Sequence, residues 1–506
     1  MSEVFNACTY LLDRHVEAGH GDRVAVTGPR GRLTYAELLD RVERVAAGLR
    51  ALRTRPEERV LIFMADGPDM IAVILGAMRM GAVPVPVSTM LSAAELTALL
   101  RDSRARTLVA SREFAATAEA AARQAPELAG VILDSAGLAS SDSTSGADVY
   151  ATSPDSIALW LYTSGTTGRP KAAMHRHASI RSVMETYGTQ VLGIRPDDRC
   201  LSASKLFFAY GLGASCLFPL AAGASVSLEP ARSTPDAIAA RVAADRPTLF
   251  FAVPTFYAAL LNADLPADTF ASVRQAVSAG EPLPARIYER FLDRFGVEII
   301  DGLGSTEALH IFLSNRPGQV RPGTTGLPVP GYELRIVDDA GADVAAGAPG
   351  HLMVRGDSIA TGYWCRTETT RQVFQGEWLR TGDTYATDQD GYFHYLGRSN
   401  DMIKSSGVWV SPTEVEERLL RHPEIAQAVV VGAGDADGLE KPVAGVVRTE
   451  GSKLAAEEIL EFCREGLPAF KRPRAVLFLD TVPTTATGKV QRFVVKEMAK
   501  DVLSPG

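Results

Sequence analysis

Apolar positions recur at helical spacing and alternate with short apolar runs through the first 110 residues. In residues 34–49 the apolar side chains fall on one helical face, and Thr34 and Glu37 form a capping box at its start. Ser92 and Glu95 form a second capping box. The pattern also predicts strands over "VLIFM", "AVPVPVS" and "TLVAS" and a helix over residues 68–80. Such alternation is typical of an α/β fold with parallel sheets and helices on their faces.

Three later apolar runs end in small or polar residues. They read "TLFFAVPT", "RQAVSAGEPLP" and "VEIIDGLGSTE". Because ligands bind to open α/β sheets at the carboxyl ends of the strands, these endings predict one side of a binding site. A fourth run, residues 159–162, predicts a short buried strand. The Ser/Gly/Asp-rich residues 135–149 before it predict a surface connection.

The last hundred or so residues predict a separate, small α+β domain. Residues 391–407 are typical of a hairpin, and Ser411, Pro412 and Glu414 together predict a capped helix start. The pattern then predicts strands over "AQAVVVGAGD", "PVAGVVRT" and "AVLFLD" and a helix over "LAAEEILEFCREGL". The sequence contains no internal repeat.

Length and composition indicate a globular protein of several parts. At 506 residues the chain exceeds what one hydrophobic core supports, so we expect two to four domains or subdomains. Hydrophobic residues make up 46% and charged residues 22%, which excludes a largely disordered chain. The 52 Lys and Arg against 60 Asp and Glu give a net charge of -8, which offers no electrostatic basis for binding nucleic acid or an anionic membrane. We therefore expect small molecules as partners.

The five cysteines are scattered without a C-x-x-C pair, which argues against a disulfide framework and a zinc site and favours a reducing, cytoplasmic location. The first residues lack a basic stretch followed by an apolar one. The longest apolar runs, such as "IAVILGAM", are too short to span a bilayer. We therefore expect neither export nor membrane insertion.

Residues 163–171, "TSGTTGRPK", place small and hydroxyl-bearing residues and a lysine directly after a predicted strand. Glycines let backbone N–H groups approach an anion, hydroxyls add donors and the lysine adds charge, so the segment predicts a phosphate-binding loop. The glycine spacing is not that of a P-loop, and "ATGKVQR" near the C-terminus does not supply it either. For this segment taken alone, a flexible turn is the alternative.

Four further motifs follow in order: "GLGSTE" (302–307), "TGD" (381–383), "YLGRSNDMIKSSG" (395–407) and "PTTATGKVQR" (483–492). Together with "TSGTTGRPK" they resemble the adenylate-forming superfamily of acyl-CoA and aryl-CoA synthetases, peptide-synthetase adenylation domains and luciferases. The resemblance extends over essentially the whole chain. It implies a large α/β N-terminal domain of stacked sheets flanked by helices, which binds AMP and the acid (1–398), a hinge (399–401) and a mobile α+β C-terminal domain (402–506).

The resemblance also implies the chemistry and the residues that perform it. A carboxylic acid attacks ATP to give an acyl-adenylate and pyrophosphate, and a thiol then displaces AMP. Glu307 would bind Mg²⁺, because a hard cation between phosphates prefers carboxylate oxygens. Thr306 would contact the α-phosphate, and Lys489 would act during adenylation. The implied ATP-binding residues are Thr163, Ser164, Gly165, Thr166, Thr167, Gly168, Lys171, Gly280, Glu281, Pro282, Asp301, Gly302, Asp383 and Arg398.

Two further roles belong to the predicted C-terminal part. Asp401 aligns with the hinge, and Gly407 would line the channel for the pantetheine arm. Each charged residue also has a plain alternative when taken singly. Lys489 and Glu307 are then solvated charges, and Asp383 or Arg398 belongs to a surface ion pair.

The acid is predicted from the segment "KLFFAYGLG". Amino-acid-activating relatives place an aspartate there, whereas this chain has an aromatic, uncharged wall. "FFAYG" and "LHIFLSN" resemble benzoate-CoA ligases, which implies an aryl carboxylate as substrate. Simple core packing is the alternative for the aromatic rings and for the histidine, and Ala214 departs from the benzoate-type pattern. The expected pocket residues are Phe207, Phe208, Ala209, Tyr210, Gly211, Gly304, His310 and Ile311.

Two acceptors remain open at this point, coenzyme A and a separate acyl carrier protein, because both present a phosphopantetheine thiol. No carrier-protein segment follows Arg492, which favours a stand-alone enzyme. We expect a monomer or a homodimer. A nucleotide-binding pseudoenzyme is disfavoured because Glu307 and Lys489 are both present. A luciferase-like oxygenase, which uses the same adenylate, is a further alternative.

Overall fold

The computed structural model describes residues 3–29, 31–133, 138, 148–164, 170–399, 401–405, 408–434, 440–484, 490–500 and 502. The chain forms two compact units. Unit 1 comprises Met1–Glu333 and Val354–Leu379, and unit 2 comprises Leu334–Met353 and Arg380–Gly506. Most of the predicted surface connection over 135–149 lies outside the described residues.

The larger sheet of unit 1 has nine strands in the order β15-β14-β13-β12-β11-β9-β10-β1-β2. Its central strands from β13 to β1 are parallel, while β14, β15 and β2 join antiparallel at the edges. The predicted parallel α/β sheet is confirmed, with antiparallel edges in addition. The strands are β1 (Val24–Gly28), β2 (Gly31–Thr34), β9 (Arg199–Ser202), β10 (Ser225–Ser227), β11 (Leu249–Ala252), β12 (Gln275–Ala279), β13 (Ile299–Gly304), β14 (Ile311–Ser314) and β15 (Leu327–Pro328).

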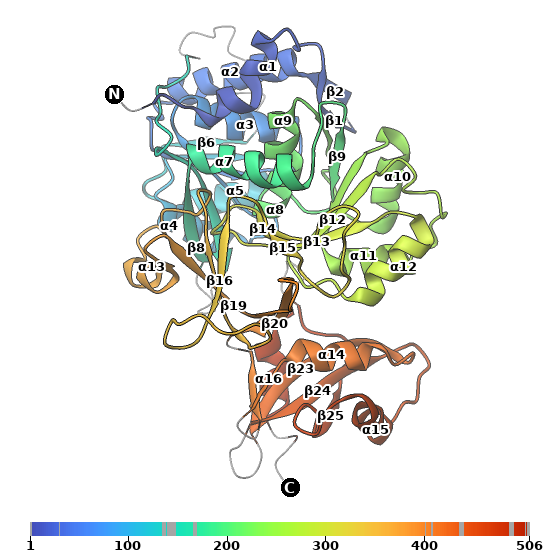
Figure 1. Cartoon of the computed structure of the whole chain (residues 1–506). Helices are drawn as coiled ribbons and strands as arrows, with labels where there is room; N and C mark the ends of the chain where they lie inside the picture. The colour runs from blue at the N-terminus through green and yellow to red at the C-terminus, as the bar shows by residue number, and fades with distance from the viewer. Residues whose placement is uncertain are drawn as a thin grey trace. The chain divides into compact units, whose positions relative to one another are not determined.

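One face of this sheet packs against α10 (Pro235–Asp245), α11 (Pro254–Asn262) and α12 (Ala285–Phe295), which lie together beside β12 and β13 in Figure 1. Phe250, Tyr257 and Phe291 are fully buried at the centre of this core. A fully buried aromatic or aliphatic side chain stabilises the fold by about 1.5–3 kcal/mol. Packing in this core therefore holds the adjoining strands of the sheet in place.

A second, four-stranded sheet of unit 1 is wholly parallel, in the order β4-β3-β5-β6. Both predicted capping boxes are present, at α2 and α4. Helix α3 contacts β1 of the larger sheet as well as β3 and β4, so it lies between the two sheets. The predicted stacked arrangement is thus confirmed. The elements are α2 (Tyr35–Ala51), β3 (Arg59–Phe63), α3 (Pro68–Arg79), β4 (Val83–Pro86), α4 (Ala93–Ser103), β5 (Thr107–Ala110), α5 (Ala115–Ala122) and β6 (Gly130–Ile132).

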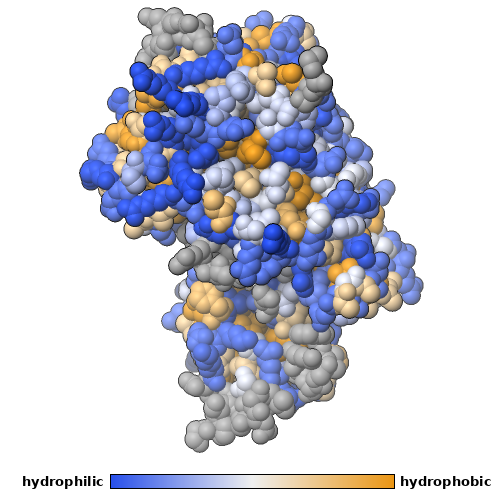
Figure 2. Space-filling view, turned by 90° about the vertical axis from the view of Figure 1, so that its left-hand side faces the viewer, coloured by the Kyte–Doolittle hydropathy of each residue, from blue (hydrophilic) through white to orange (hydrophobic). Residues whose placement is uncertain are grey.

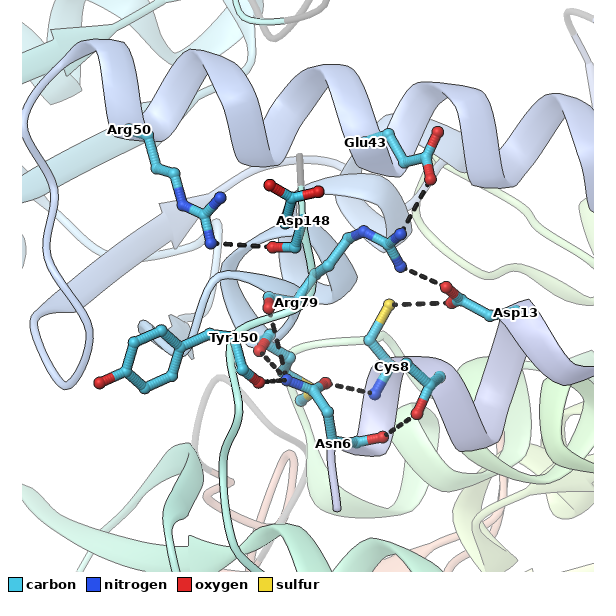
Figure 3. Close-up of polar contacts among 10 residues, drawn as sticks. Asn6, Cys8, Asp13, Glu43, Arg50, Arg79, Asp148 and Tyr150 are labelled. Atoms are coloured by element: carbon cyan, nitrogen blue, oxygen red, sulfur yellow. Dashed lines mark hydrogen bonds and ion pairs between the residues drawn. The ribbon is translucent and has the colours of Figure 1, made fainter. Parts of the chain in front are cut away.

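A buried ion-pair network holds the first residues of the chain to this layer (Figure 3). Arg79, at the end of α3, pairs with Asp13 and, at 2.8 Å, with Glu43. The Asn6 side chain donates to the carbonyl of Met78 at 2.9 Å. The N-terminal segment, which includes the helical turns η1 (Thr9–Asp13) and α1 (Arg14–Glu17), is therefore part of the folded core.

Unit 2 contains strands of three sheets, one of which is the two-stranded antiparallel sheet of β21 and β22. Strands β16, β17 and β19 follow one another in one sheet, and β20 pairs with β19. In the three-stranded sheet, β23 pairs antiparallel with β24 and β24 pairs parallel with β25. The capped helix predicted at Ser411 is present as α14. The elements are β16 (Glu333–Val337), β17 (Gly350–Arg355), β19 (Trp378–Thr387), β20 (Phe393–Arg398), β21 (Ile403–Ser405), β22 (Val408–Val410), α14 (Pro412–Leu420), β23 (Ile425–Gly434), β24 (Glu440–Arg448), α15 (Ala456–Gly466), β25 (Ala475–Phe478) and α16 (Arg492–Met498).

The face drawn in Figure 2 carries mostly polar and charged side chains, with apolar ones in small separate groups. Within the described residues, no helix has both the length and the apolar character needed to cross a bilayer.

Candidate active site

The predicted phosphate loop is held by a β-hairpin of unit 1. Strands β7 (Ile157–Ser164) and β8 (Pro170–Arg176) pair antiparallel in a two-stranded sheet, with Thr163 opposite Lys171. The strand predicted over 159–162 is therefore confirmed. The pairing brings the first and last residues of the motif together and makes 165–169 the connection. Gly165, Thr166, Thr167 and Gly168 lie outside the described residues, as does the side chain of Ser164.

The strand endings predicted as an adenine-side wall lie next to one another in the larger sheet. Asp301 and Gly302 of β13 pair with Ser278 and Ala279 of β12, directly before Gly280. Glu281 accepts a hydrogen bond from the Thr255 hydroxyl at 2.6 Å, and Pro282 is exposed.

Asp301 is a buried carboxyl group in this wall, 6% exposed, and its Oδ1 has no hydrogen-bond partner among the described residues. Burial raises the pKa of Asp301 to about 8, because the charged form loses its hydration in the protein interior. A neutral carboxyl group is therefore available at this wall near neutral pH.

Thr306 and Glu307 lie in the loop between β13 and β14. The Nε2 of His175 faces the Thr306 carbonyl oxygen at 2.8 Å, and because a carbonyl only accepts, the imidazole donates. Burial lowers the pKa of His175 to about 4, so the ring is neutral and acts as a fixed donor. The loop is thereby tied to β8, the strand that carries Lys171.

Tyr363 contacts both of these motifs. Its hydroxyl donates to Oε1 of Glu307 at 2.6 Å, and the Lys171 ammonium lies over its ring, 4.4 Å from the centroid. Neither Tyr363 nor His175 was expected from the sequence. The one sequence signal for the tyrosine is a glycine followed by two aromatic residues, Gly362-Tyr363-Trp364. No sequence signal marks His175.

The predicted aryl pocket segment forms the short helix α8 (Ala209–Leu212), which continues into the helical turns η4 (Gly213–Leu217) and α9 (Phe218–Ala222). The Tyr210 hydroxyl donates to the Val277 carbonyl at 2.9 Å, so it anchors α8 to β12. The rings of Phe207 and Phe208 lie 4.5 Å apart. Phe207 is buried, whereas Phe208, Ala209 and Tyr210 remain partly exposed.

His310 lies at the centre of an aromatic set. Its ring centroid is 4.5 Å from that of Phe218, 5.5 Å from that of Tyr187 and 5.6 Å from that of Tyr210. Burial lowers the pKa of His310 to about 3, which keeps the ring neutral, and its Nε2 faces the Tyr210 carbonyl at 3.4 Å. Ile311 beside it is buried. Phe218 and Tyr187 were not predicted as members of this set.

Glycines allow the close backbone approaches around this set. A Cβ atom on Gly213 would lie 2.2 Å from Cδ2 of His310, and one on Gly211 would lie 2.0 Å from the Lys205 carbonyl oxygen. A Cβ atom on Gly304 would lie 2.7 Å from the His310 carbonyl oxygen. A side chain would therefore fit at Gly213 only if the His310 ring moved, and at Gly211 or Gly304 only if the surrounding backbone moved.

In unit 2, Asp383 of β19 lies opposite Arg398 of β20, and the two side chains pair at 3.2 Å. Asp383 is buried, whereas the side chain of Arg398 is 53% exposed, so only the carboxylate of this pair is shielded from solvent. Asp401 lies 3.7 Å from Nε of Arg492. Gly407 and Lys489 lie outside the described residues.

Among the described residues, no group of three or more His, Cys, Asp or Glu side chains could hold a metal ion. The single half-buried Glu307 carboxylate nevertheless suits Mg²⁺, which usually takes one or two carboxylates together with phosphate oxygens and water.

Comparison with known proteins places the chain in a family. The profile of the AMP-binding enzyme family matches residues 12–364, and that of the AMP-binding enzyme C-terminal domain matches residues 414–489. The chain belongs to the AMP-binding enzyme family. It is 42% identical to a benzoate–CoA ligase of Thauera aromatica, over 98% of this chain and 96% of that protein.

Solved structures agree with this assignment. A benzoate CoA ligase from Burkholderia xenovorans LB400 superposes with a TM-score of 0.91 at 41% identity, covering 97% of this chain and 100% of that one. An anthranilate CoA ligase in complex with anthranoyl-AMP superposes with a TM-score of 0.93 at 36% identity, covering 99% and 98%. The adenylate-forming fold predicted from the motifs is therefore confirmed.

Proposed function

We propose that the chain is an AMP-forming aryl acid–CoA ligase that activates a benzoate-like acid with ATP and Mg²⁺ and transfers the aryl group to coenzyme A. One observation carries the proposal. The segment from β13 to β14 supplies both Glu307, linked to Lys171 through Tyr363, and His310, packed in an uncharged aromatic set. A nucleotide-phosphate site and an aryl site are thus built from adjacent residues.

In the first step an oxygen of the acid bonds to the α-phosphorus of ATP, and the bond to the bridging oxygen breaks to release pyrophosphate. In the second step the thiol sulfur of coenzyme A bonds to the acyl carbon and AMP leaves. Lys171 and the donors of the loop over 163–171 would neutralise the phosphates and align them with the acid. Mg²⁺, bound through Glu307, would spread the same phosphate charge.

The remaining predicted roles are part of the same proposal. Thr306 would contact the α-phosphate, and Asp383 and Arg398 would contact the ribose side. The wall at Gly280, Glu281, Pro282, Asp301 and Gly302 would hold adenine. The C-terminal part, with Asp401 at its hinge, would present Lys489 for adenylation and Gly407 for thioester formation. The pairing of Thr163 with Lys171 supports the phosphate assignment.

The aryl preference rests on the chemistry around His310. The surrounding side chains are aromatic, and the imidazole is neutral, so an amino acid's ammonium group would meet no opposite charge there. A flat ring instead gains edge and face contacts with the neighbouring rings. Relatives named for benzoate and for anthranilate leave the ring substituent open.

The test is pyrophosphate release with a panel of acids, followed by detection of the thioester. We expect faster turnover with benzoate and its hydroxy and amino derivatives than with a twelve-carbon fatty acid, and coenzyme A to serve as acceptor. Faster turnover of the fatty acid would contradict the aryl assignment. Transfer to a phosphopantetheinyl carrier protein but not to coenzyme A would contradict the acceptor.

We also propose that the protein works in the cytoplasm, as a monomer or homodimer. All five cysteines are unpaired, four of them buried, which supports a reducing compartment. Fractionation of the producing cells, with a tag on the chain, tests the compartment.

A further inference from the structure

Tyr363 lies in a segment whose backbone is fixed against the strand that carries the phosphate lysine. It forms an antiparallel bridge with Ala173 of β8. On either side, the Met174 amide donates to the Gly362 carbonyl at 3.1 Å and the Trp364 amide donates to the Ala172 carbonyl at 3.0 Å. The tyrosine is 5% exposed. Main-chain bonds on both sides therefore fix the backbone of Tyr363, and its ring packs against that of Phe374, with the centroids 5.3 Å apart.

The same segment also fixes the backbone of the metal motif. The Ala360 amide donates to the Glu307 carbonyl at 2.8 Å, and the Ser358 hydroxyl donates to the Ala308 carbonyl at 2.7 Å. Strand β8 and the loop after β13 are therefore joined through residues 358–364. The tyrosine side chain lies at the junction.

Two charged groups use different parts of this one side chain. The hydroxyl donates to a single carboxylate oxygen of Glu307, a charge-assisted bond that orients the carboxylate and leaves its other oxygen for a further ligand. The ring face attracts the Lys171 ammonium, at 4.4 Å from its centroid. Glu307 therefore contacts the hydroxyl of Tyr363 and Lys171 contacts its ring face, so one side chain orients both charged groups.

We propose that Tyr363 is a positioning residue that orients Glu307 toward Mg²⁺ and Lys171 toward the phosphates of the same nucleotide. This inference rests on the proposed function. The hydroxyl acts on the metal, because a partner that holds a ligating carboxylate typically changes metal affinity by about 10- to 100-fold when it is removed. The ring acts on the lysine, and therefore on ATP with or without metal.

The two contacts can be separated by substitution. Tyr363→Phe removes the hydroxyl and keeps the ring, whereas Tyr363→Leu removes both. Tyr257→Phe is the matched control, because the Tyr257 hydroxyl also makes a buried hydrogen bond, to the Val277 carbonyl at 2.8 Å, but within the core under α11. Far-UV circular dichroism and melting temperature show whether each variant is folded.

The measurement is equilibrium binding of ATP by calorimetry without any acid substrate, in Mg²⁺ and in EDTA. Tyr363→Phe should weaken binding in Mg²⁺ by about 10- to 100-fold and leave binding in EDTA within about twofold of the wild type. Tyr363→Leu should weaken both. In the Glu307→Gln background, Tyr363→Phe should cause no further loss in Mg²⁺.

Three outcomes would overturn the inference: equal losses for Tyr363→Phe in Mg²⁺ and EDTA, behaviour of Tyr363→Phe like the Tyr257→Phe control, or a wild type whose ATP affinity does not respond to Mg²⁺. A wild type that binds no ATP at all would instead contradict the proposed function. The two failures are therefore distinct.

Discussion

Gly213 gives the ring of His310 the space that it occupies. In Gly213→Ala the new methyl group would displace the imidazole, since 2.2 Å is far inside contact distance. We expect a loss of stability of about 1–3 kcal/mol from overpacking. The KM for the aryl acid should rise on the order of tenfold, with the KM for ATP unchanged.

Steady-state kinetics of pyrophosphate release check this prediction. Gly28→Ala serves as the control, because the nearest atom to its new Cβ, the Leu228 carbonyl oxygen, lies 3.7 Å away. Equal rises of both KM values in Gly213→Ala would place His310 away from the acid.

Asp301 predicts a pH dependence of stability. Its pKa is raised from about 3.8 in the unfolded chain to about 8 by burial, so the folded protein binds the proton more tightly. The contribution of the protonated Asp301 to the free energy of unfolding is fully present below the pKa of the unfolded chain. It is lost as the pH rises through about 8, at up to about 1.4 kcal/mol per pH unit. Asp301→Asn, which does not titrate, should therefore gain on the wild type between pH 6 and 8.

Urea unfolding of both proteins at pH 6, 7 and 8 measures this difference. A constant difference across these pH values would show that Asp301 is already ionised in the folded protein.

At the scale of elements, the ion pair between Asp13 and Arg79 should couple the effects of substitutions at these two residues on the free energy of unfolding. Asp13→Ala removes one of the two carboxylates that pair with the buried Arg79 guanidinium in Figure 3, the other being Glu43, and breaking such a pair typically costs about 3–5 kcal/mol. Arg79→Met removes the charge itself. In the double variant the loss from Asp13→Ala should be much smaller. Denaturant midpoints of the four proteins check the cycle, and additive losses would mean that the two residues act independently.

The sequence predicted helices and strands better than it predicted which strands pair with each other, and the reason is physical. The capping boxes at Thr34 and Ser92 depend on residues three apart, so the local pattern contains the whole signal. The pairing of β7 with β8 as a separate hairpin, and the antiparallel turn of β14 onto β13, depend on register with other strands. Hydrophobic runs specify a strand but not its neighbour.

The same distinction applies to the site. Lys171 and Glu307 were predicted because each belongs to a motif with its own spacing, and Asp383 and Arg398 likewise. Tyr363 reaches Glu307 only because residues 360–364 add to the edge of β8, and His175 reaches Thr306 across two strands. Contacts of this kind arise from tertiary pairing, and no local pattern specifies them.

At the scale of the whole molecule, the two half-reactions should separate. If the C-terminal part presents Lys489 only while charge builds on the α-phosphate and pyrophosphate, Lys489→Ala should slow pyrophosphate release on the order of 10²- to 10³-fold. Conversion of supplied aryl-adenylate and coenzyme A to thioester should be retained. Lys500→Ala, which removes an exposed cation paired with Glu497, is the control.

Quenched-flow assays of each half-reaction measure the two rates. An equal, large loss in both steps from a folded Lys489→Ala variant would contradict a role limited to adenylation.

The central claim is that an aryl carboxylate oxygen attacks the α-phosphorus of ATP. Benzoate labelled with heavy oxygen in its carboxyl group tests this directly, with mass spectrometry of the products after turnover with ATP, Mg²⁺ and coenzyme A. The account predicts one labelled oxygen in AMP, none in pyrophosphate, and one retained in the thioester carbonyl. Label in inorganic phosphate with ADP as the nucleotide product, or unlabelled AMP alongside thioester, would contradict it.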